Sequence, residues 1–335
     1  MRRIGNLYGH IADYENLLAA FHAAARGKRD RAEVQEFARH LPDRIGRLRD
    51  ELLAETVHLG NYHYFLIHDP KQRRICAAEF RERVLHHAVI NVVGLYLERP
   101  LIDHTFACRK GKGQLRAARF AQDCARRFPF FLKMDIRKYF DSIAHATVRD
   151  QLGRLFKDPA LLRFFDRLLD TYETRQGHGL PIGNLTSQYL ANLYLSTFDH
   201  YVKQVLRCRA YVRYMDDLLL FGARHEVNSW QESGAAFLAE ELGLEVKNGG
   251  FTNRTAHGCD FCGYRVLPIR LGLARHAARR MRRKWMVLER AYTMHGIGAL
   301  ELQSRAAALF AFAETADSGV FRRNLARASI LGERA

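Results

Sequence analysis

The chain has 335 residues, of which 53 are Lys or Arg and 36 are Asp or Glu, so its formal net charge is +17. This length allows one large domain or two to three subdomains with ample core. The excess of positive charge predicts a polyanionic partner, most simply nucleic acid, although a basic solvated face is the alternative. There is no run of about 18 apolar residues and no apolar stretch after Met1-Arg2-Arg3, which argues against a membrane partner.

Six cysteines are scattered through this large chain, which predicts reduced thiols and a cytoplasmic location. Cys259 and Cys262 form a lone C-x-x-C pattern with no second pair nearby. We therefore interpret them as core residues of a strand and not as a zinc or redox site.

The first 100 residues are predicted to be helices followed by a hairpin. Residues 10–60 carry apolar residues at helical spacing, and Pro42 is expected to kink a helix or to begin a new one. Residues 62–67 are predicted to form a strand that leads into a basic turn at 69–75, and 80–89 to form a helix. His86 and His87 are adjacent on this helix and point about 100° apart, so they do not form a metal-ligand pair.

Arg109, Lys110 and Lys112 stand among glycines in the next loop. Cations separated by flexible glycine fit a clamp on the phosphates of a nucleic-acid template. The loop lacks the G-x-x-x-x-G-K-[ST] pattern of a nucleotide-binding P-loop.

The middle of the chain alternates predicted strands with helices. Residues 130–135 form an apolar strand that ends in Asp135. Residues 150–175 are expected to be helical. A Gly/Pro turn at 179–183 then leads into a helix that begins near Asn184 or Thr186.

Residues 211–221 contain two apolar arms on either side of Asp216 and Asp217. The arms are typical of strands, so the two carboxylates are placed at the tip of a hairpin. Neighbouring carboxylates raise each other's pKa unless a cation shares them, and Mg²⁺ prefers oxygen ligands of this kind. An ordinary Asp-Asp turn is the alternative for this pair taken alone.

The last third is predicted to be a helix at 229–243, a strand at 244–247, a hairpin at 261–266 and, after Pro268, a mainly helical region. One of these helices concentrates positive charge that suits the phosphates of a duplex and predicts salt-sensitive binding. Its basic residues are Arg275, Arg279, Arg280, Arg282, Arg283 and Lys284.

Three of these segments, in this order, resemble motifs A, B and C of reverse transcriptases: the strand ending in Asp135, the turn and helix at 179–188, and the hairpin with Asp216 and Asp217. The resemblance covers about residues 10–330. It implies an α+β right-hand polymerase fold with fingers, a palm with an antiparallel sheet, and a helical thumb. The implied boundaries are an N-terminal helical segment at 1–60, fingers at 61–128, palm at 129–266 and thumb at 267–335.

The resemblance also implies the reaction and its metal ligands. A primer 3′-hydroxyl attacks the α-phosphate of a dNTP and pyrophosphate leaves, with two Mg²⁺ ions, or Mn²⁺ in their place, as cofactors. The metals would be held by Asp135, Asp216, Asp217 and the backbone carbonyl of Ile136. Lys247 matches the motif D lysine, which can protonate the leaving pyrophosphate, and a solvated surface lysine is the alternative.

By the same resemblance, Arg74 holds the incoming triphosphate, with a plain solvated loop as the alternative. Phe140 lies under the sugar and excludes a 2′-hydroxyl, with core packing as the alternative. Gly183 lets the backbone approach the nucleotide. The residues expected at the dNTP site are Arg74, Lys71, Arg73, Phe140, Ile182, Gly183 and Gln188. Those expected to bind nucleic acid are Arg109, Lys110, Lys112, Arg279, Arg280, Arg282, Arg283 and Lys284.

Ile182 stands where most reverse transcriptases have Gln. The stretch from Ile182 to Gln188 resembles motif B of the enzymes of diversity-generating retroelements, which copy a template RNA with errors at adenines. Because Ile cannot make the hydrogen bond of a Gln amide, we interpret Ile182 as a determinant of low fidelity, with a neutral variant as the alternative.

The implied partners are template RNA, the primer or cDNA strand, dNTPs and a small basic oligomeric accessory protein. Two other interpretations stay open. One is another bacterial reverse transcriptase, used in phage defence or untemplated synthesis. The other is a catalytically idle RNA-binding scaffold with the same fold.

Overall fold

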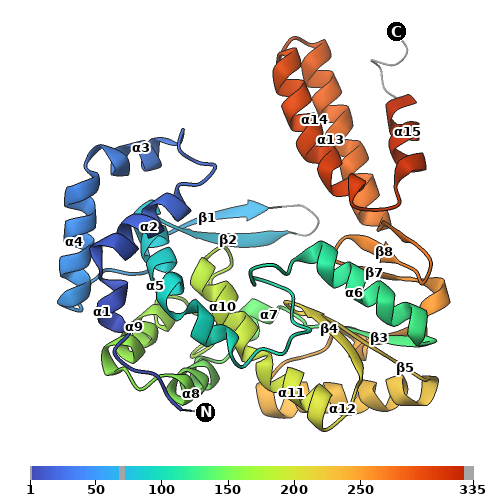
Figure 1. Ribbon diagram of the computed structural model, residues 1–335, viewed down its shortest axis with the longest axis horizontal. Coiled ribbons are helices and arrows are strands. Elements are labelled where there is room, and N and C mark those ends of the chain that lie inside the picture. Colours follow the sequence, from blue (N-terminus) through green and yellow to red (C-terminus); the bar gives the residue numbers. More distant parts are fainter. Residues whose placement is uncertain (1, 68–71, 328–335) are drawn as a thin grey trace. The chain divides into compact units, whose positions relative to one another are not determined.

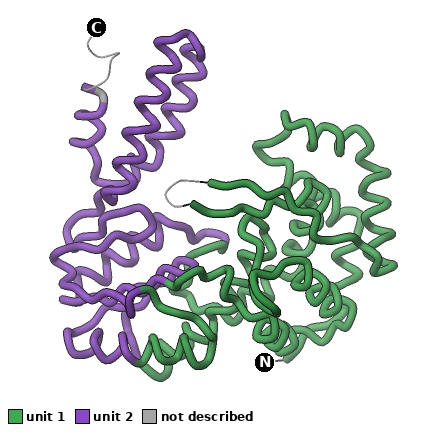
Figure 2. Tube along the Cα trace, turned by 180° about the vertical axis from the view of Figure 1, so that it is seen from behind, with its two compact units in different colours: residues 1–109, 136–206, 233–247 green, residues 110–135, 207–232, 248–335 purple. Residues whose placement is uncertain are grey.

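The computed structural model describes residues 2–67 and 72–327 (Figure 1). The chain divides into two compact units, each built from segments far apart in the sequence (Figure 2). The first unit contains residues 1–109, 136–206 and 233–247. The second unit contains residues 110–135, 207–232 and 248–335.

The first unit is mainly helical, with one two-stranded antiparallel sheet of β1 (Tyr62–Ile67) and β2 (Arg73–Ala78). Its helices are α1 (Tyr8–Ile11), α2 (Tyr14–Ala24), α3 (Ala32–Arg39), α4 (Leu41–Leu53), α5 (Phe80–Glu98), α7 (Tyr139–Ser142), α8 (His145–Leu155), α9 (Pro159–Leu169), α10 (Leu185–Tyr194) and α11 (Ser196–Gln204). Pro42 lies in the first turn of α4, so it begins a new helix, where its missing N–H has no partner to lose.

The helix predicted at 150–175 is two helices, α8 and α9, and the prediction of one was wrong. Phe156 leaves the helix in an extended conformation and forms a parallel bridge with Ile4. The backbone N–H of Lys157 then donates to the Ile4 carbonyl at 2.7 Å. A segment more than 150 positions away therefore takes the backbone hydrogen bonds that would have continued α8.

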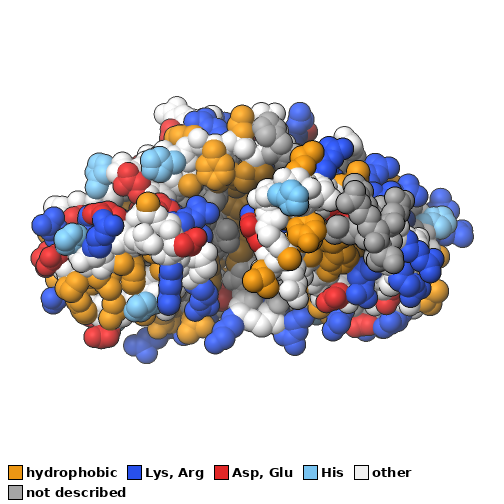
Figure 3. Space-filling view, turned by 90° about the horizontal axis from the view of Figure 1, so that it is seen from above, with side chains coloured by type: hydrophobic (Ala, Val, Ile, Leu, Met, Phe, Trp, Pro, Cys, Tyr) orange, Lys and Arg blue, Asp and Glu red, His pale blue; other side chains and the backbone are white. Residues whose placement is uncertain are grey.

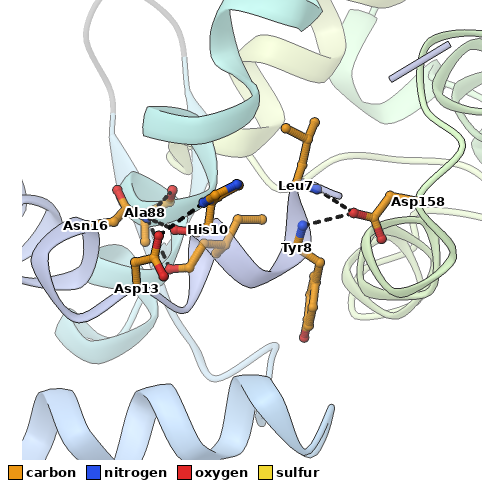
Figure 4. Close-up of polar contacts among 8 residues, drawn as sticks. Leu7, Tyr8, His10, Asp13, Asn16, Ala88 and Asp158 are labelled. Atoms are coloured by element: carbon orange, nitrogen blue, oxygen red, sulfur yellow. Dashed lines mark hydrogen bonds and ion pairs between the residues drawn. The ribbon is translucent and has the colours of Figure 1, made fainter. Parts of the chain in front are cut away.

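Asp158 fixes this junction (Figure 4). Its buried carboxylate accepts hydrogen bonds from the N–H groups of Leu7 at 2.7 Å and Tyr8 at 2.9 Å, and caps α9 by accepting from Leu161 N–H at 3.2 Å. Burial alone would raise the pKa of this carboxyl, but the backbone donors outweigh it and hold the pKa below 3.8. Asn16 also ties the N-terminal segment to α5 by donating to the Ala88 carbonyl at 3.1 Å.

Replacing Asp158 by Ala should lower the free energy of unfolding by about 3 kcal/mol, because it leaves buried N–H donors without an acceptor and removes a helix cap. The folded-state pKa is lowered, so this stabilisation is complete well above pH 3.8 and is lost as the pH falls through the folded-state pKa. Urea unfolding at pH 7 and at pH 3 checks both points: the difference in stability between wild type and Asp158→Ala should be smaller at pH 3 than at pH 7. The exposed Asp150→Ala in α8 is the control and should change stability little.

The second unit is built on a four-stranded antiparallel sheet with strand order β4-β5-β3-β6. Its strands are β3 (Phe130–Asp135), β4 (Ala210–Tyr214), β5 (Asp217–Gly222) and β6 (Phe251–Arg254). Helix α6 (Gln114–Arg127) packs against β4 and β5 (Figure 1). The buried rings of Phe131 on β3 and Phe221 on β5 have centroids 6.4 Å apart, and the exposed ring of Phe251 on β6 lies 6.0 Å from Phe131. The core of the sheet therefore lies over β3 and β5.

The second unit also holds a three-stranded sheet of β7 (Cys259–Phe261), β8 (Tyr264–Val266) and β9 (Leu271–Leu273). Helices α13 (Arg275–Thr293), α14 (Ala299–Glu314) and α15 (Gly319–Arg327) follow it and share a small core. Tyr264 joins β8 to these helices, because its ring contacts Phe312 and its hydroxyl is 2.7 Å from the Thr315 hydroxyl. Antiparallel sheets accompanied by many helices confirm the predicted α+β class. Within the described residues, no helix is long and apolar enough to cross a membrane.

The strand predicted at 244–247 does not form. Helix α12 (Arg224–Leu242) confirms the helix expected before it, but Val246 then forms only a single bridge, with Ile136. Lys247 begins a 3-10 turn (Lys247–Gly249), in which Asn248 has a φ of 49°. A left-handed residue at this point ends the extended backbone that a ladder needs.

Candidate active site

Strand pairing brings two of the predicted catalytic carboxylates face to face. In the antiparallel pair of β3 and β5, Asp135 lies directly opposite Asp217. Tyr214 pairs with Asp217 across the β4–β5 hairpin, which leaves Met215 and Asp216 as its two-residue turn. All three carboxylates therefore lie at the same end of the sheet, where Asp135 ends β3 and Asp217 begins β5, and Asp216 is in the hairpin turn that the sequence predicted.

Arg213 holds this turn in place and was missed by the sequence analysis. Met215 has a φ of 55°, a left-handed conformation that is energetically unfavourable for a residue with a Cβ. The Arg213 side chain is fully buried, and its guanidinium donates a hydrogen bond to the Met215 carbonyl at 3.3 Å. A buried arginine within an apolar strand is the signal that could have pointed to this role.

Lys133 contacts the carboxylate of Asp217 and was also missed. Its Nζ lies 3.1 Å from Oδ1 and 3.3 Å from Oδ2 of Asp217, and it donates to the Asp260 carbonyl at 2.6 Å. The signal was in the sequence: residues two apart on a strand share a face, so Lys133 had to lie on the same face as Asp135.

Charge and burial act in opposite directions on Asp217. Burial raises its pKa, Lys133 lowers it, and Asp216 and Asp135 raise it again, so that the pKa is about 6. Although its Oδ1 lies near Lys133, that oxygen is buried and has no aligned hydrogen bond. Like charges directly opposite each other on a sheet are destabilising.

The residues present therefore fit a divalent cation. A buried carboxylate oxygen without a hydrogen bond, beside two further carboxylates, is the donor set that Mg²⁺ or Mn²⁺ prefers. Within residues 2–67 and 72–327, no group of three or more His, Cys, Asp and Glu side chains is gathered so that it could hold a metal ion as it stands. The fit rests on the three aspartates of the hairpin and β3.

Ile136 and Lys247 come close to each other in the first unit. The backbone of Ile136 forms an antiparallel bridge with Val246, the residue before Lys247. Arg137 reinforces the contact, because its N–H donates to the Glu245 carbonyl at 2.8 Å and its guanidinium pairs with the Glu245 carboxylate at 2.9 Å. The segment after Asp135 and the expected motif D lysine are thus fixed together.

Backbone hydrogen bonds gather the residues expected around the dNTP in the first unit. The Leu180 N–H donates to the Phe140 carbonyl at 2.8 Å, and the Cys76 N–H donates to the Ile182 carbonyl at 2.8 Å. The loop at 179–184 is therefore tied on one side to the α7 turn and on the other to β2. Phe140 and Ile182 are both half-buried.

Gly183 packs its backbone against β2. Its φ is 121°, and a Cβ at this position would lie 2.9 Å from Ile75 Cγ2 and 3.3 Å from the Cys76 carbonyl oxygen. Arg73 and Arg74 lie in β2 itself and not in the basic turn where the sequence placed them. The Arg74 guanidinium lies 4.1 Å from the centroid of the Tyr64 ring, and Lys71 lies outside the described residues.

Asn184 and Gln188 flank the start of α10. The Asn184 side chain is buried and accepts a hydrogen bond from Ala78 N–H at 3.3 Å, so it connects the loop to β2, a role that the sequence analysis missed. The Gln188 Oε1 accepts a hydrogen bond from the Cys108 thiol at 3.2 Å.

The residues expected to bind nucleic acid differ in their surroundings. Arg109 is bonded inside the first unit: its guanidinium lies 3.1 Å from the Glu98 carboxylate and donates to the carbonyls of Ile102 at 2.7 Å and Thr105 at 3.1 Å. It therefore stabilises the fold, and a phosphate contact by it stays a prediction. Lys110 and Lys112 belong to the second unit.

Helix α13 carries the basic band that the sequence predicted. Its buried side presents Met281 to the core of α13–α15. Among the residues expected to bind nucleic acid, Arg279, Arg282, Arg283 and Lys284 are exposed and Arg280 is partly buried. Lys and Arg side chains are also spread over the face of the molecule shown in Figure 3.

The chain matches the model of one known protein family. The family model described as reverse transcriptase (RNA-dependent DNA polymerase) matches residues 68–266, more than half of the chain. A search of curated proteins returned no match.

A solved structure of a telomerase shares the fold. Apo telomerase from Candida tropicalis is 10% identical with a TM-score of 0.51, over 80% of this chain and 59% of the telomerase chain. Telomerase from Candida albicans in complex with a fragment of telomeric RNA is 12% identical with a TM-score of 0.47, over 70% and 52% of the two chains. The chain thus spans little more than half the length of these structures. The match over residues 68–266 shows that the chain belongs to the reverse transcriptase (RNA-dependent DNA polymerase) family.

Proposed function

We propose that this chain is the error-prone reverse transcriptase of a diversity-generating retroelement. The family gives the general activity, RNA-directed DNA polymerisation. The observation that supports catalysis most directly is the pairing of Asp135 with Asp217, next to Asp216 at the hairpin tip. An idle scaffold has no need for three carboxylates at one end of the sheet.

Asp135, Asp216 and Asp217 would hold the metal ions, with the carbonyl of Ile136 as a further ligand. Divalent metals bound there would stabilise the attacking 3′-oxygen and the leaving pyrophosphate. Lys247 would deliver a proton to the pyrophosphate. The chain's own contribution is to position these groups, through the β3–β5 register and through the Ile136–Val246 bridge.

The loop at 179–184 and strand β2 would form the dNTP site. Arg74, with Arg73 and Lys71, would bind the triphosphate, since a guanidinium fork matches phosphate oxygens. Phe140 would lie under the sugar and select deoxyribose. The hydrogen bonds from Leu180 to Phe140 and from Cys76 to Ile182 support this assignment, because they tie the loop to both α7 and β2.

Low fidelity is assigned to Ile182. The backbone carbonyl of Ile182 is fixed to β2, which leaves only its side chain to vary against a nucleotide. An aliphatic side chain gives dispersion contacts that do not depend on correct pairing, whereas an amide makes an oriented hydrogen bond worth about 0.5–1.5 kcal/mol. Up to about a tenfold loss of discrimination follows from the upper end of this range.

Replacing Ile182 by Gln should therefore reduce misincorporation at template adenines by up to about tenfold. The measurement is primed synthesis on an RNA template with all four bases and Mg²⁺, followed by sequencing of the product. Ile182→Leu is the matched control, because it keeps the volume and adds no hydrogen bond, and its error rate should stay at the wild-type level. Accurate synthesis by the wild type would retain reverse transcription and point to another bacterial class.

The partners proposed on this basis are template RNA, the primer or cDNA strand, and a small basic oligomeric accessory protein. The exposed basic residues of α13 and the lysines at 110 and 112 would contact nucleic-acid phosphates, with strong salt dependence. All six cysteines are free thiols, which supports a location in the reducing cytoplasm.

A further inference from the structure

Lys133 joins three strands of the second unit through one ammonium group. From β3 it reaches the Asp217 carboxylate on β5, at 3.1 and 3.3 Å, and the Asp260 carbonyl on β7, at 2.6 Å. About 27% of the Lys133 side chain and 29% of the Asp217 side chain are exposed. The pair is thus partly withdrawn from water, where an ion pair is stronger than on an open surface.

The negative charge of the three neighbouring carboxylates is stabilised by a nearby cation. Asp135 and Asp217 are directly opposite each other, and Asp216 precedes Asp217 in the chain. Like charges in this arrangement repel each other. The ammonium of Lys133 lies at the carboxylate where a divalent metal would also bind, so the two cations would compete for Asp217.

We propose that Lys133 is the resident counter-cation of the catalytic carboxylates: its ammonium neutralises Asp217 in the metal-free enzyme and gives way, toward the Asp260 carbonyl, when a divalent metal binds. The inference rests on the proposed function, since it requires that these carboxylates hold the metal. It assigns a positioning role to a residue outside the metal ligands.

The structure provides a second place for the ammonium. Lysine has three N–H donors on a flexible four-carbon chain, so it can keep one hydrogen bond while another is exchanged. The Asp260 carboxylate is already paired with Arg265 at 3.0 Å, so the hairpin offers Lys133 its backbone carbonyl. Metal binding at Asp217 is thereby linked to the β7–β8 hairpin, and the link must act in both directions.

The test is direct binding of Mn²⁺ to the full chain without nucleic acid, measured from the electron paramagnetic resonance signal of free Mn²⁺. Lys133→Met and Lys133→Gln remove the charge, and Lys133→Gln keeps a hydrogen-bond donor. Both should bind Mn²⁺ about three- to tenfold more tightly than wild type, the effect expected of losing one partly buried competing ion pair. Lys133→Arg keeps the charge and should bind as wild type does. Lys157→Met, the same charge change on an exposed lysine of the first unit, should have no effect.

Thermal unfolding gives a second readout. In EDTA the charge-removing variants should unfold at a lower temperature than wild type, and Mn²⁺ should raise that temperature by more than it does in wild type. Unchanged or weaker Mn²⁺ binding in both variants would overturn the proposal. Asp217→Asn distinguishes a wrong role for Lys133 from a wrong metal site. If Asp217→Asn binds Mn²⁺ as tightly as wild type, the carboxylates are not the metal site at all.

Discussion

Asp217→Asn should reduce primer extension on an RNA template by about a thousandfold or more, while the protein remains folded. The substitution removes one charge from the three-carboxylate cluster and keeps the shape of the side chain. A metal that stabilises the attacking and leaving oxygens contributes several kcal/mol, and each 1.36 kcal/mol is a factor of ten in rate. Asp217 is also the residue at which β5 pairs with both Asp135 and Tyr214, so its backbone position is strongly fixed.

Single-turnover extension with saturating dNTP and Mg²⁺ is the measurement, with circular dichroism as the check on folding. Asp123→Asn is the matched control, because Asp123 lies in the same unit on α6, pairs with Arg126 at 2.8 Å and is about 58% exposed. Its activity should stay within about twofold of wild type, since an exposed ion pair contributes little. Activity above about a tenth of wild type in Asp217→Asn would contradict the assignment of this carboxylate to the metals.

The hairpin that carries these carboxylates could be predicted because local and long-range signals agree there. Apolar arms on either side of two aspartates indicate two strands and a tight turn, and the structure has β4, the turn and β5 at that place. That Asp135 lies directly opposite Asp217 could not be predicted from these local signals, because the register depends on how β3 and β5 align over their whole length. The order of the motifs in the sequence predicted that the three carboxylates share one site, but not which residues of β3 and β5 pair.

Side chains that support the site were harder to predict from the sequence. Lys133 and Arg213 look like ordinary charges in apolar strands, and their roles follow from partners on other strands, Asp217 and the Met215 carbonyl. Tertiary contacts also decided the break between α8 and α9, where Ile4 competes for the backbone of residues 156 and 157. Local periodicity contains no information about such a distant competitor.

The prediction that both cysteines of the C-x-x-C pattern are core residues of a strand is right for one of them only. Cys259 is a buried strand residue of β7, as predicted. Cys262 instead lies in the β7–β8 turn with a φ of 51°, next to Gly263 with a φ of 85°. Burial raises the pKa of the Cys259 thiol to about 12, which disfavours the thiolate that zinc or disulfide chemistry needs.

Gly183→Ala should both destabilise the first unit and impair dNTP binding. The φ of 121° is unfavourable for any residue with a Cβ, and the added methyl would lie 2.9 Å from Ile75 Cγ2 and 3.3 Å from the Cys76 carbonyl. Strain and overpacking together should lower the free energy of unfolding by about 2–4 kcal/mol. Because Ile182 precedes this glycine and accepts the hydrogen bond from Cys76, the loop cannot move away from β2 without losing that bond.

Two other glycines separate the causes. Gly177 has a φ of 68°, and an added Cβ would meet no atom within 4 Å, so Gly177→Ala reports backbone strain alone and should cost about 1–2 kcal/mol. Gly153 lies in α8 with open space around it, so Gly153→Ala should stabilise the protein by about 0.5–1 kcal/mol. Urea unfolding gives these values, and steady-state kinetics should show a higher KM for dNTP in Gly183→Ala only. If Gly183→Ala costs no more than Gly177→Ala and leaves that KM unchanged, the close packing of the loop on β2 does not shape the nucleotide site.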